Sequence, residues 1–241
     1  MANGLDVPWD LGQNGPMDAQ ELWDGLDEAW REAFRQGWDA VRGGNIGVGA
    51  VASTADGEIV HASRNRVNEK DGPHGEIFGS SLAHAEMNVL ARLGFRKHQN
   101  LVLTTTLQPC LQCAGAIRFA RIGTVRFAGH DVYWDGYHDF GKLAVRERAR
   151  QRRPVGRLGP RDDELGVFGL LMSRFRLGNP RLGDADFEAA LWAMGEGPVL
   201  DLAYQIEDSG ELQVLMVKEV DQALTALWPR LQALTAHYRT M

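Results

Sequence analysis

The sequence contains very little cysteine. Its 241 residues include two, Cys110 and Cys113, three positions apart. A disulfide between them would close too short a loop to stabilise the fold, and a close pair in a chain without an export signal is typical of metal or redox chemistry. Residues 1–20 lack the basic segment followed by an apolar segment that marks a secretory signal, so we expect a cytoplasmic protein.

Long hydrophobic runs are also absent. No apolar stretch reaches the ~18 residues that a membrane span needs, and no membrane partner is expected. Hydrophobic residues make up 44% of the chain and charged residues 24%. This balance is ordinary for a soluble globular protein and excludes disordered and collagen-like chains.

The chain has no overall excess of positive charge. Its formal net charge is −6, which argues against binding nucleic acid through the charge of the whole protein. Basic residues nevertheless gather in residues 142–161, which hold eight Lys and Arg and one Glu, whereas residues 1–40 hold nine acidic side chains and two Arg. We interpret the basic stretch as a solvated helix face or a contact surface, with a polyanion site as the alternative.

Hydrophobic periodicity predicts an α/β fold. Asp18 is a good helix cap, and apolar residues recur at three- and four-residue steps from Leu22 to Val41, which predicts one amphipathic helix. A turn at Asp56-Gly57 between two β-like runs predicts a hairpin. The predicted strands are 46–53, 59–64, 101–106 and 124–128, and further helices cover 82–93 and 110–120. Strands separated by single helices imply parallel pairing.

The last hundred residues carry no motif with chemical content. The elements predicted there are a basic helix over 142–153, a connector over 156–160, helices near 163–175, 184–194 and 219–238, and a hairpin over 199–217 around Ser209-Gly210. We therefore divide the chain into an irregular N-terminal segment (1–17), an α/β domain (18–141) and a mainly helical C-terminal extension (142–241) of open role.

The residues that carry chemistry lie at two predicted helix N-termini. They are His84 and Glu86 in His-Ala-Glu, and the two cysteines in Pro109-Cys110-Leu-Gln-Cys113. One imidazole and two thiolates are ligands that zinc prefers, and three protein ligands leave a fourth position for water. A helix N-terminus favours thiolate over thiol. A free carboxylate beside such a site can move protons. A structural metal site and a redox pair are the alternatives.

This combination resembles the cytidine deaminase superfamily, whose signature is His-x-Glu followed by Pro-Cys-x-x-Cys. The resemblance covers about residues 20–140 and makes 18–141 a zinc-dependent deaminase domain. It implies a three-layer α/β/α cytidine-deaminase-like sheet, followed by the mostly helical extension. It also implies that His84, Cys110 and Cys113 bind Zn²⁺ and that Glu86 is the catalytic proton shuttle.

The resemblance further implies substrate contacts. The backbone N–H of Ala85 and the side chain of Asn65 match the family's contacts to the base or sugar. Aromatic residues hold flat bases by stacking, so Phe78, Tyr133 and Trp134 are further candidates, with packing as the alternative for each. Family members assemble as oligomers, and on that ground alone a homodimer or higher homo-oligomer is expected.

Details of the motifs narrow the substrate. Histidine as the first ligand, Cys-Ala-Gly-Ala-Ile and Arg-Ile-Gly-Thr-Val are similar to the branch with tRNA adenosine deaminases, guanine deaminases and bacterial nucleoside deaminases. The long loop between Asn65 and His84, Gln108 before Pro-Cys, and residues 131–136 depart from the tRNA enzymes. We expect hydrolytic deamination of the exocyclic amine of a free nucleobase or nucleoside by a zinc-activated water. The alternatives are wobble adenosine in tRNA or another nucleic acid, and a specialised amino-heterocycle metabolite or nucleoside antibiotic.

Overall fold

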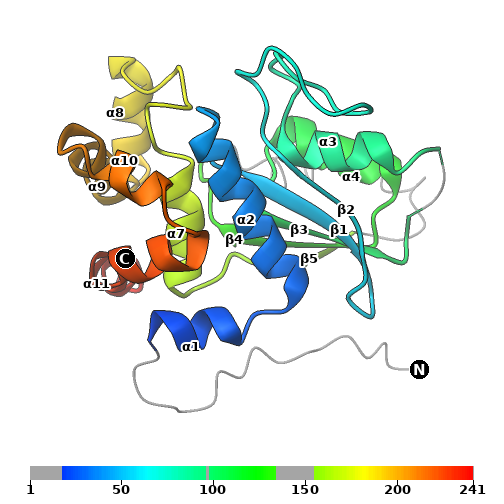
Figure 1. Ribbon diagram of the computed structural model, residues 1–241, viewed down its shortest axis with the longest axis horizontal. Coiled ribbons are helices and arrows are strands. Elements are labelled where there is room, and N and C mark those ends of the chain that lie inside the picture. Colours follow the sequence, from blue (N-terminus) through cyan, green and yellow to red (C-terminus); the bar gives the residue numbers. More distant parts are fainter. Residues whose placement is uncertain (1–17, 96–97, 134–154, 241) are drawn as a thin grey trace.

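The computed structural model describes residues 18–95, 98–133 and 155–240 (Figure 1). The predicted irregular segment 1–17, the predicted basic helix 142–153 and the candidate Trp134 lie outside the described residues. Within the described ranges, helices pack around a single central sheet (Figure 1).

The sheet has five strands in the order β2-β1-β3-β4-β5. The strands are β1 (Gly49–Thr54), β2 (Ile59–Arg64), β3 (Leu101–Leu107), β4 (Thr124–Gly129) and β5 (Gly156–Leu158). β1 pairs antiparallel with β2 and with β3, whereas β3–β4 and β4–β5 pair in parallel. The predicted hairpin and the predicted parallel pairing across the helix at 111–120 are therefore both present. The parallel pairing predicted across the helix at 82–93 is wrong, because β1 lies between β2 and β3.

Helices cover both faces of this sheet. They are α1 (Ala19–Asp24), α2 (Glu28–Arg42), α3 (Ala85–Arg92), α4 (Leu111–Ala120), α7 (Glu164–Met172), α8 (Ala185–Ala193), α9 (Gly197–Asp208), α10 (Glu211–Met216) and α11 (Val220–Tyr238). α2 and α7 pack on one face, where the rings of Phe34 and Phe168 stack with centroids 5.9 Å apart. α3 and α4 lie on the other face. This arrangement confirms the predicted three-layer α/β/α fold with a mostly helical C-terminal part.

The single helix predicted from Asp18 to Val41 is wrong, because two helices occupy that range. α1 ends at Gly25, and the Asp27 side chain accepts a hydrogen bond from the Trp30 N–H at the start of α2. The same carboxylate forms an ion pair of 2.5 Å with Arg126 on β4. A second N-cap inside the apolar repeat therefore interrupts the helix and ties the start of α2 to the sheet.

Two predictions for the C-terminal part are also wrong. The stretch expected to form a hairpin over 199–217 forms α9 and α10. Gly210 has a φ of +77° and makes a turn between helices, and apolar residues of α9 at helical spacing pack towards α7. The stretch 156–160, predicted as a connector, contains β5, whose short run pairs with the open edge of β4.

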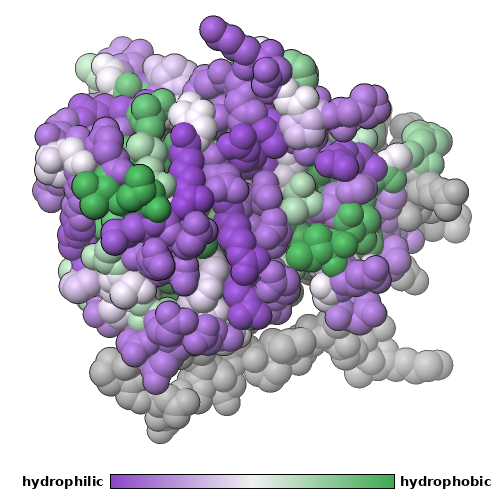
Figure 2. All heavy atoms as spheres, viewed as in Figure 1, coloured by the Kyte–Doolittle hydropathy of each residue, from purple (hydrophilic) through white to green (hydrophobic). Residues whose placement is uncertain are grey.

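The C-terminal helices share one hydrophobic core with the sheet. This core joins side chains of α1 and α2, of the strands, and of α7, α9 and α11. Hydrophilic residues predominate on the face seen in Figure 2, and hydrophobic ones gather there in a few patches. Within the described ranges, no helix has both the length and the apolar character that crossing a membrane would require.

Candidate active site

The N-terminus of α3 presents the His-Ala-Glu motif. The helix was predicted to begin at Leu82 but begins at Ala85, with His84 as its N-cap in an extended conformation. Residues 80–83 form a turn closed by a hydrogen bond from the Ala83 N–H to the Ser80 carbonyl. Because the helix starts later, both His84 and Glu86 lie at the helix entrance rather than on its flank.

The N-terminus of α4 presents the two cysteines. β3 ends at Leu107, Cys110 is the N-cap of α4, and Cys113 lies in its first turn. α3 and α4 pack against each other, which brings their N-termini together. His84 Nδ1 lies 3.5 Å from Cys110 Sγ and 3.4 Å from Cys113 Sγ. The three ligand atoms all lie within 4.8 Å of one another.

These distances fit a zinc ion. Tetrahedral zinc with sulfur ligands at ~2.3 Å and nitrogen at ~2.0 Å places neighbouring sulfur and nitrogen atoms roughly 3.5 Å apart. The distances from His84 Nδ1 to the two cysteine sulfurs, 3.5 Å and 3.4 Å, agree with this value. Among the described residues, His84, Cys110 and Cys113 form the group of His, Cys, Asp or Glu side chains whose ligand atoms lie close enough together to hold a metal ion.

The electrostatics of the cluster also suit a cation. The pKa of Cys110 is lowered to about 4 by hydrogen bonding from Cys113 and by the nearby His84, against the effect of burial. Hydrogen bonding with Cys110 and burial raise the pKa of Cys113 well above the ordinary thiol value. The pair therefore holds one thiolate readily, and a bound dication would favour deprotonation of the second.

Glu86 lies next to the cluster but outside its ligand set. Its side chain is 3% exposed, and Cys113 Sγ donates a hydrogen bond of 3.5 Å to its Oε2. Burial raises the pKa of this carboxyl group to about 7, against the lowering effect of His84. A carboxyl group in this position can both accept and return a proton.

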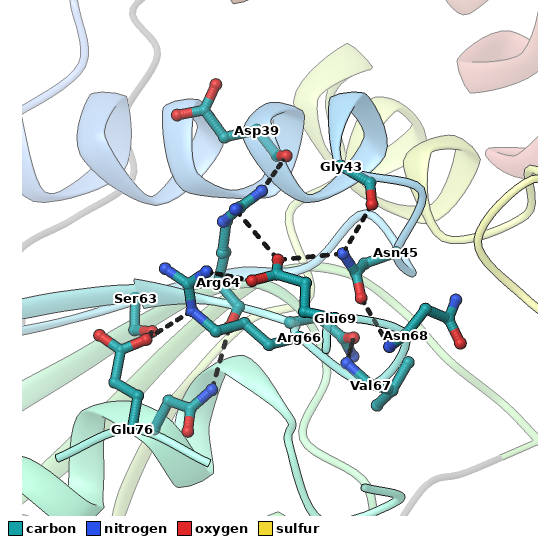
Figure 3. Close-up of polar contacts among 12 residues, drawn as sticks. Asp39, Gly43, Asn45, Ser63, Arg64, Arg66, Val67, Asn68, Glu69 and Glu76 are labelled. Carbon is teal, nitrogen blue, oxygen red and sulfur yellow. Dashed lines mark hydrogen bonds and ion pairs between the residues drawn. The ribbon is translucent and has the colours of Figure 1, made fainter. Parts of the chain in front are cut away.

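A polar network holds the chain around the end of β2, which Asn65 directly follows. Arg64 and Arg66 form ion pairs with Glu69, and Arg66 also pairs with Glu76 at 2.6 Å (Figure 3). The Asn65 Oδ1 accepts a hydrogen bond from the Val67 N–H at 3.1 Å. The start of the long loop after β2 is therefore held to the strand by largely buried charges on both sides of Asn65.

A cavity of about 590 Å³ opens above the cluster. It is lined by His84, Glu86, Cys110 and Asn65, and by Ile46, Val48, Ser81, Leu107, Gln108, Leu111, Gln112, Asp131, Arg174, Asn179, Arg181 and Phe187. The last four come from the C-terminal extension, whose sequence contains no motif with chemical content. Gln112 Nε2 is buried and has no hydrogen-bond partner.

The residues from the extension are held in place by charge and by aromatic packing. The buried Arg174 donates a hydrogen bond of 2.7 Å to Glu196 and lies 3.2 Å from Asp131. The Arg181 guanidinium lies 4.4 Å from the centre of the Phe187 ring. No local sequence pattern marked these side chains, because they reach the cavity from the end of α7, the turn that follows it and the start of α8.

The remaining described candidates for substrate contact are not among the residues that line the cavity. Ala85 is fully buried at the first position of α3. Tyr133 packs edge-on against Phe187, with ring centroids 4.8 Å apart, and so supports a wall of the cavity without being among its lining residues. Phe78 is 39% exposed in the long loop, covers Gly72, and is not a lining residue. The roles of these side chains stay predictions.

Known proteins share the part of the chain that carries the site. Residues 25–129 match the family described as the cytidine and deoxycytidylate deaminase zinc-binding region. The tRNA-specific adenosine deaminase of Bacillus subtilis is 30% identical over 151 residues, 61% of this chain and 86% of that protein. A solved tRNA:A34 deaminase is 28% identical with a TM-score of 0.38, covering 44% of this chain and 78% of that one.

For one further relative, the match covers only a small part of that protein. It is the tRNA(Ile)-lysidine synthase of Deinococcus radiodurans, 37% identical over 106 residues, which are 42% of this chain and 17% of that protein. Together with the spacing of the cluster, the match to the family and to the Bacillus subtilis protein shows that the chain belongs to the cytidine deaminase superfamily. It is an enzyme of the deaminase class with Zn²⁺ as its cofactor.

Proposed function

We propose that this protein catalyses hydrolytic deamination of a free nucleobase or nucleoside. The observation that carries the proposal is the cavity of about 590 Å³ above the cluster, one wall of which comes from the chain's own C-terminal extension. Sites for small molecules are concave and enclose roughly 300–1,000 Å³. A base attached to a polynucleotide needs an open path for its backbone, and Arg174, Asn179 and Phe187 occupy one side of this opening.

The proposed zinc ligands are His84 Nδ1, Cys110 Sγ and Cys113 Sγ. When bound, zinc supplies Lewis acidity that lowers the pKa of water towards 7. Hydrolysis joins a water oxygen to the amino-bearing ring carbon, breaks the carbon–nitrogen bond and releases ammonia. The buried cysteine at the start of α4 and the histidine at the start of α3 are each held by backbone that packing fixes, which favours a preformed ligand set.

Glu86 is the proposed proton shuttle. The reaction needs one group that moves two protons in turn. It takes the first from water and gives it to the ring nitrogen, then takes the second from the newly attached hydroxyl group and gives it to the departing amine. The carboxyl group lines the cavity beside the cluster and is not needed as a ligand, so it stays free for this cycle.

Three polar groups are proposed to orient the base. Ala85 is the first residue of α3, where a backbone N–H has no acceptor within the helix. Asn65 lines the cavity with its side-chain oxygen engaged, which leaves its amide N–H groups as donors. Gln112 Nε2 has no hydrogen-bond partner and lines the same cavity. A base with ring carbonyl and ring nitrogen acceptors complements these donors.

The proposal is tested by measuring ammonia release from purified, zinc-loaded protein. The panel holds cytosine, cytidine, adenine, adenosine, guanine, guanosine and their deoxy forms, with Glu86→Gln as the blank. We expect turnover of one small molecule that the variant does not turn over. A tRNA mixture is assayed alongside the panel. Inosine formed in tRNA, with no small molecule turned over, would contradict the proposal.

Wobble adenosine in tRNA is the second candidate substrate. It is favoured by the 30% identity to the Bacillus subtilis tRNA-specific adenosine deaminase over most of that protein. The basic stretch 142–161, of which 155–161 lies within the described residues, is the proposed contact to phosphates in that case. Binding would then weaken steeply with salt, which a filter-binding assay at two salt concentrations measures. A homo-oligomer in the cytoplasm stays part of the proposal for either substrate.

A further inference from the structure

A second cavity of about 410 Å³ lies within the C-terminal part of the fold. It is bounded by the chain after β4, the N-terminus of α7, the turn between α8 and α9 and the C-terminal end of α11. Its lining residues differ throughout from those of the cavity above the metal cluster. Neither the family match, which ends at residue 129, nor the proposed reaction assigns it a role.

Three buried oxygen atoms that line this second cavity retain hydrogen-bonding capacity, although Tyr238 interacts with the Val199 backbone N–H and the Glu196 carboxylate with that of Val132. They are Thr235 Oγ1, Tyr238 Oη and Glu196 Oε1. Thr235 and Glu196 are each 3% exposed. A buried polar atom without a partner is costly, and native proteins keep such atoms paired with protein, water or ligand. One such atom, Thr235 Oγ1, together with two oxygens that can accept further hydrogen bonds, indicates a site that a polar group enters.

The chemistry of the lining narrows the class of ligand. The carboxylate of Glu196 accepts hydrogen bonds, and the hydroxyl groups of Thr235 and Tyr238 can do the same. The rest of the wall includes the apolar side chains of Val167 and Leu170 and the charged side chains of Arg161 and Asp163, which form an ion pair with each other. The wall therefore complements a molecule with N–H donors at one end and an apolar, ring-sized body.

We propose that this cavity is a second ligand site, which binds a small amine or amino-heterocycle through Glu196, Thr235 and Tyr238. The site adjoins the proposed active site through one buried side chain. Arg174 lines the first cavity, and its Nε donates to Glu196 Oε2 at 2.7 Å, while Glu196 lines the second. The ligand of the second cavity thus contacts the carboxylate that holds Arg174 in the wall of the first.

The test measures binding of a matched pair of probes to the zinc-loaded full-length protein. The probes are 2-aminoquinoline and 2-methylquinoline, which have nearly the same shape but differ in the N–H donors. Calorimetry at mildly alkaline pH, where both probes are uncharged, gives each dissociation constant. We expect 2-aminoquinoline to bind about tenfold more tightly, which corresponds to one or two hydrogen bonds.

Two variants locate the binding. Val167→Phe places a ring in the cavity and is expected to abolish binding of both probes. Thr235→Val with Tyr238→Phe removes two hydroxyl groups. The first has no partner and the second interacts with the Val199 backbone N–H, so thermal unfolding should change little. This double variant is expected to bind 2-aminoquinoline about tenfold more weakly and 2-methylquinoline as before. Phe187→Leu, in the wall of the other cavity, is the matched control and should change neither affinity.

Several results would overturn the second site. They are equal affinity of the two probes for the unmodified protein, no binding of either, and unchanged affinity for 2-aminoquinoline in both variants. A loss caused by Phe187→Leu instead would assign the binding to the cavity above the metal cluster. Because every readout is binding rather than turnover, failure here is distinguishable from failure of the proposed deaminase reaction.

Discussion

Two regions line the cavity above the metal cluster in different ways. One is formed by the N-termini of α3 and α4, and the other is the segment 174–187. At the helix entrances, reactive groups lie on short, rigid backbone within 4.8 Å of one another. In the segment 174–187, long side chains reach the cavity from the end of α7, the following turn and the start of α8, and are held by ion pairs and ring contacts. Under the proposed function, the reaction and the choice of substrate would therefore be carried by separable parts of this molecule.

The largest expected effect tests the helix entrances. Glu86→Gln should retain about one zinc per chain and lose roughly 10²–10⁴-fold in turnover number, because the side chain is near the cluster without being a ligand. Metal analysis and ammonia release measure the two properties. Glu58→Gln, an exposed position in the β1–β2 hairpin, is the matched control and should change neither. Loss of zinc in Glu86→Gln would contradict its role as a non-ligand.

The second prediction tests the ligand set itself. Cys110→Ser should lose zinc and, with it, all turnover, because a serine hydroxyl is a far weaker zinc ligand than a thiolate. Thermal unfolding with and without a chelator measures the stability that the metal contributes, and the variant should be insensitive to chelation. A variant that keeps both zinc and activity would end the assignment of this cysteine.

The third prediction tests the ion pairs that hold the extension in place. Arg174→Met should destabilise the fold by about 3–5 kcal/mol, because the buried Glu196 carboxylate loses its cation. Arg176→Met, two positions along, removes ion pairs from a half-exposed guanidinium and should cost no more than about 1 kcal/mol. Urea unfolding of both variants gives the comparison, and similar losses would show that burial of Arg174 is unimportant.

The deficit of Arg174→Met should depend on pH. Burial raises the pKa of Glu196 despite the attraction of Arg174, and without that cation the charged form is less favourable still. A group whose pKa is raised in the folded state destabilises the fold as pH rises through its titration. The difference between variant and unmodified protein should therefore shrink as the pH is lowered towards the ordinary pKa of a glutamate. A deficit that grows on acidification would contradict this assignment.

The smallest expected effect tests the choice of substrate. Phe187→Leu keeps an apolar side chain in the wall but removes the ring, and should raise KM for the accepted base or nucleoside several-fold with little change in kcat. Phe119→Leu, at a side chain 83% exposed on α4, is the matched control. If kcat falls with zinc retained while KM is unchanged, Phe187 acts on the reacting groups and the two parts are not separable.

Much of the deaminase-like part was predictable because its signals are local. Helix caps, the Asp56-Gly57 turn and the alternation of strands and helices each depend on neighbouring residues, and the structure confirms the fold class they predict. Local signals also explain the errors. Asp27 interrupts an otherwise continuous apolar repeat, and Ser209-Gly210 makes the same kind of turn between two helices as between two strands.

The sequence by itself determined the donor set, because one imidazole, two thiols and one carboxyl group at these spacings restrict the chemistry before any folding is considered. Only the tertiary structure decided that the extension closes the cavity above them. Arg174, Asn179, Arg181 and Phe187 lie more than sixty residues after Cys110, and their approach depends on α7 and the following turns packing into the core of the sheet. Such contacts leave no periodic trace, because each residue is selected by a neighbour that is distant along the chain.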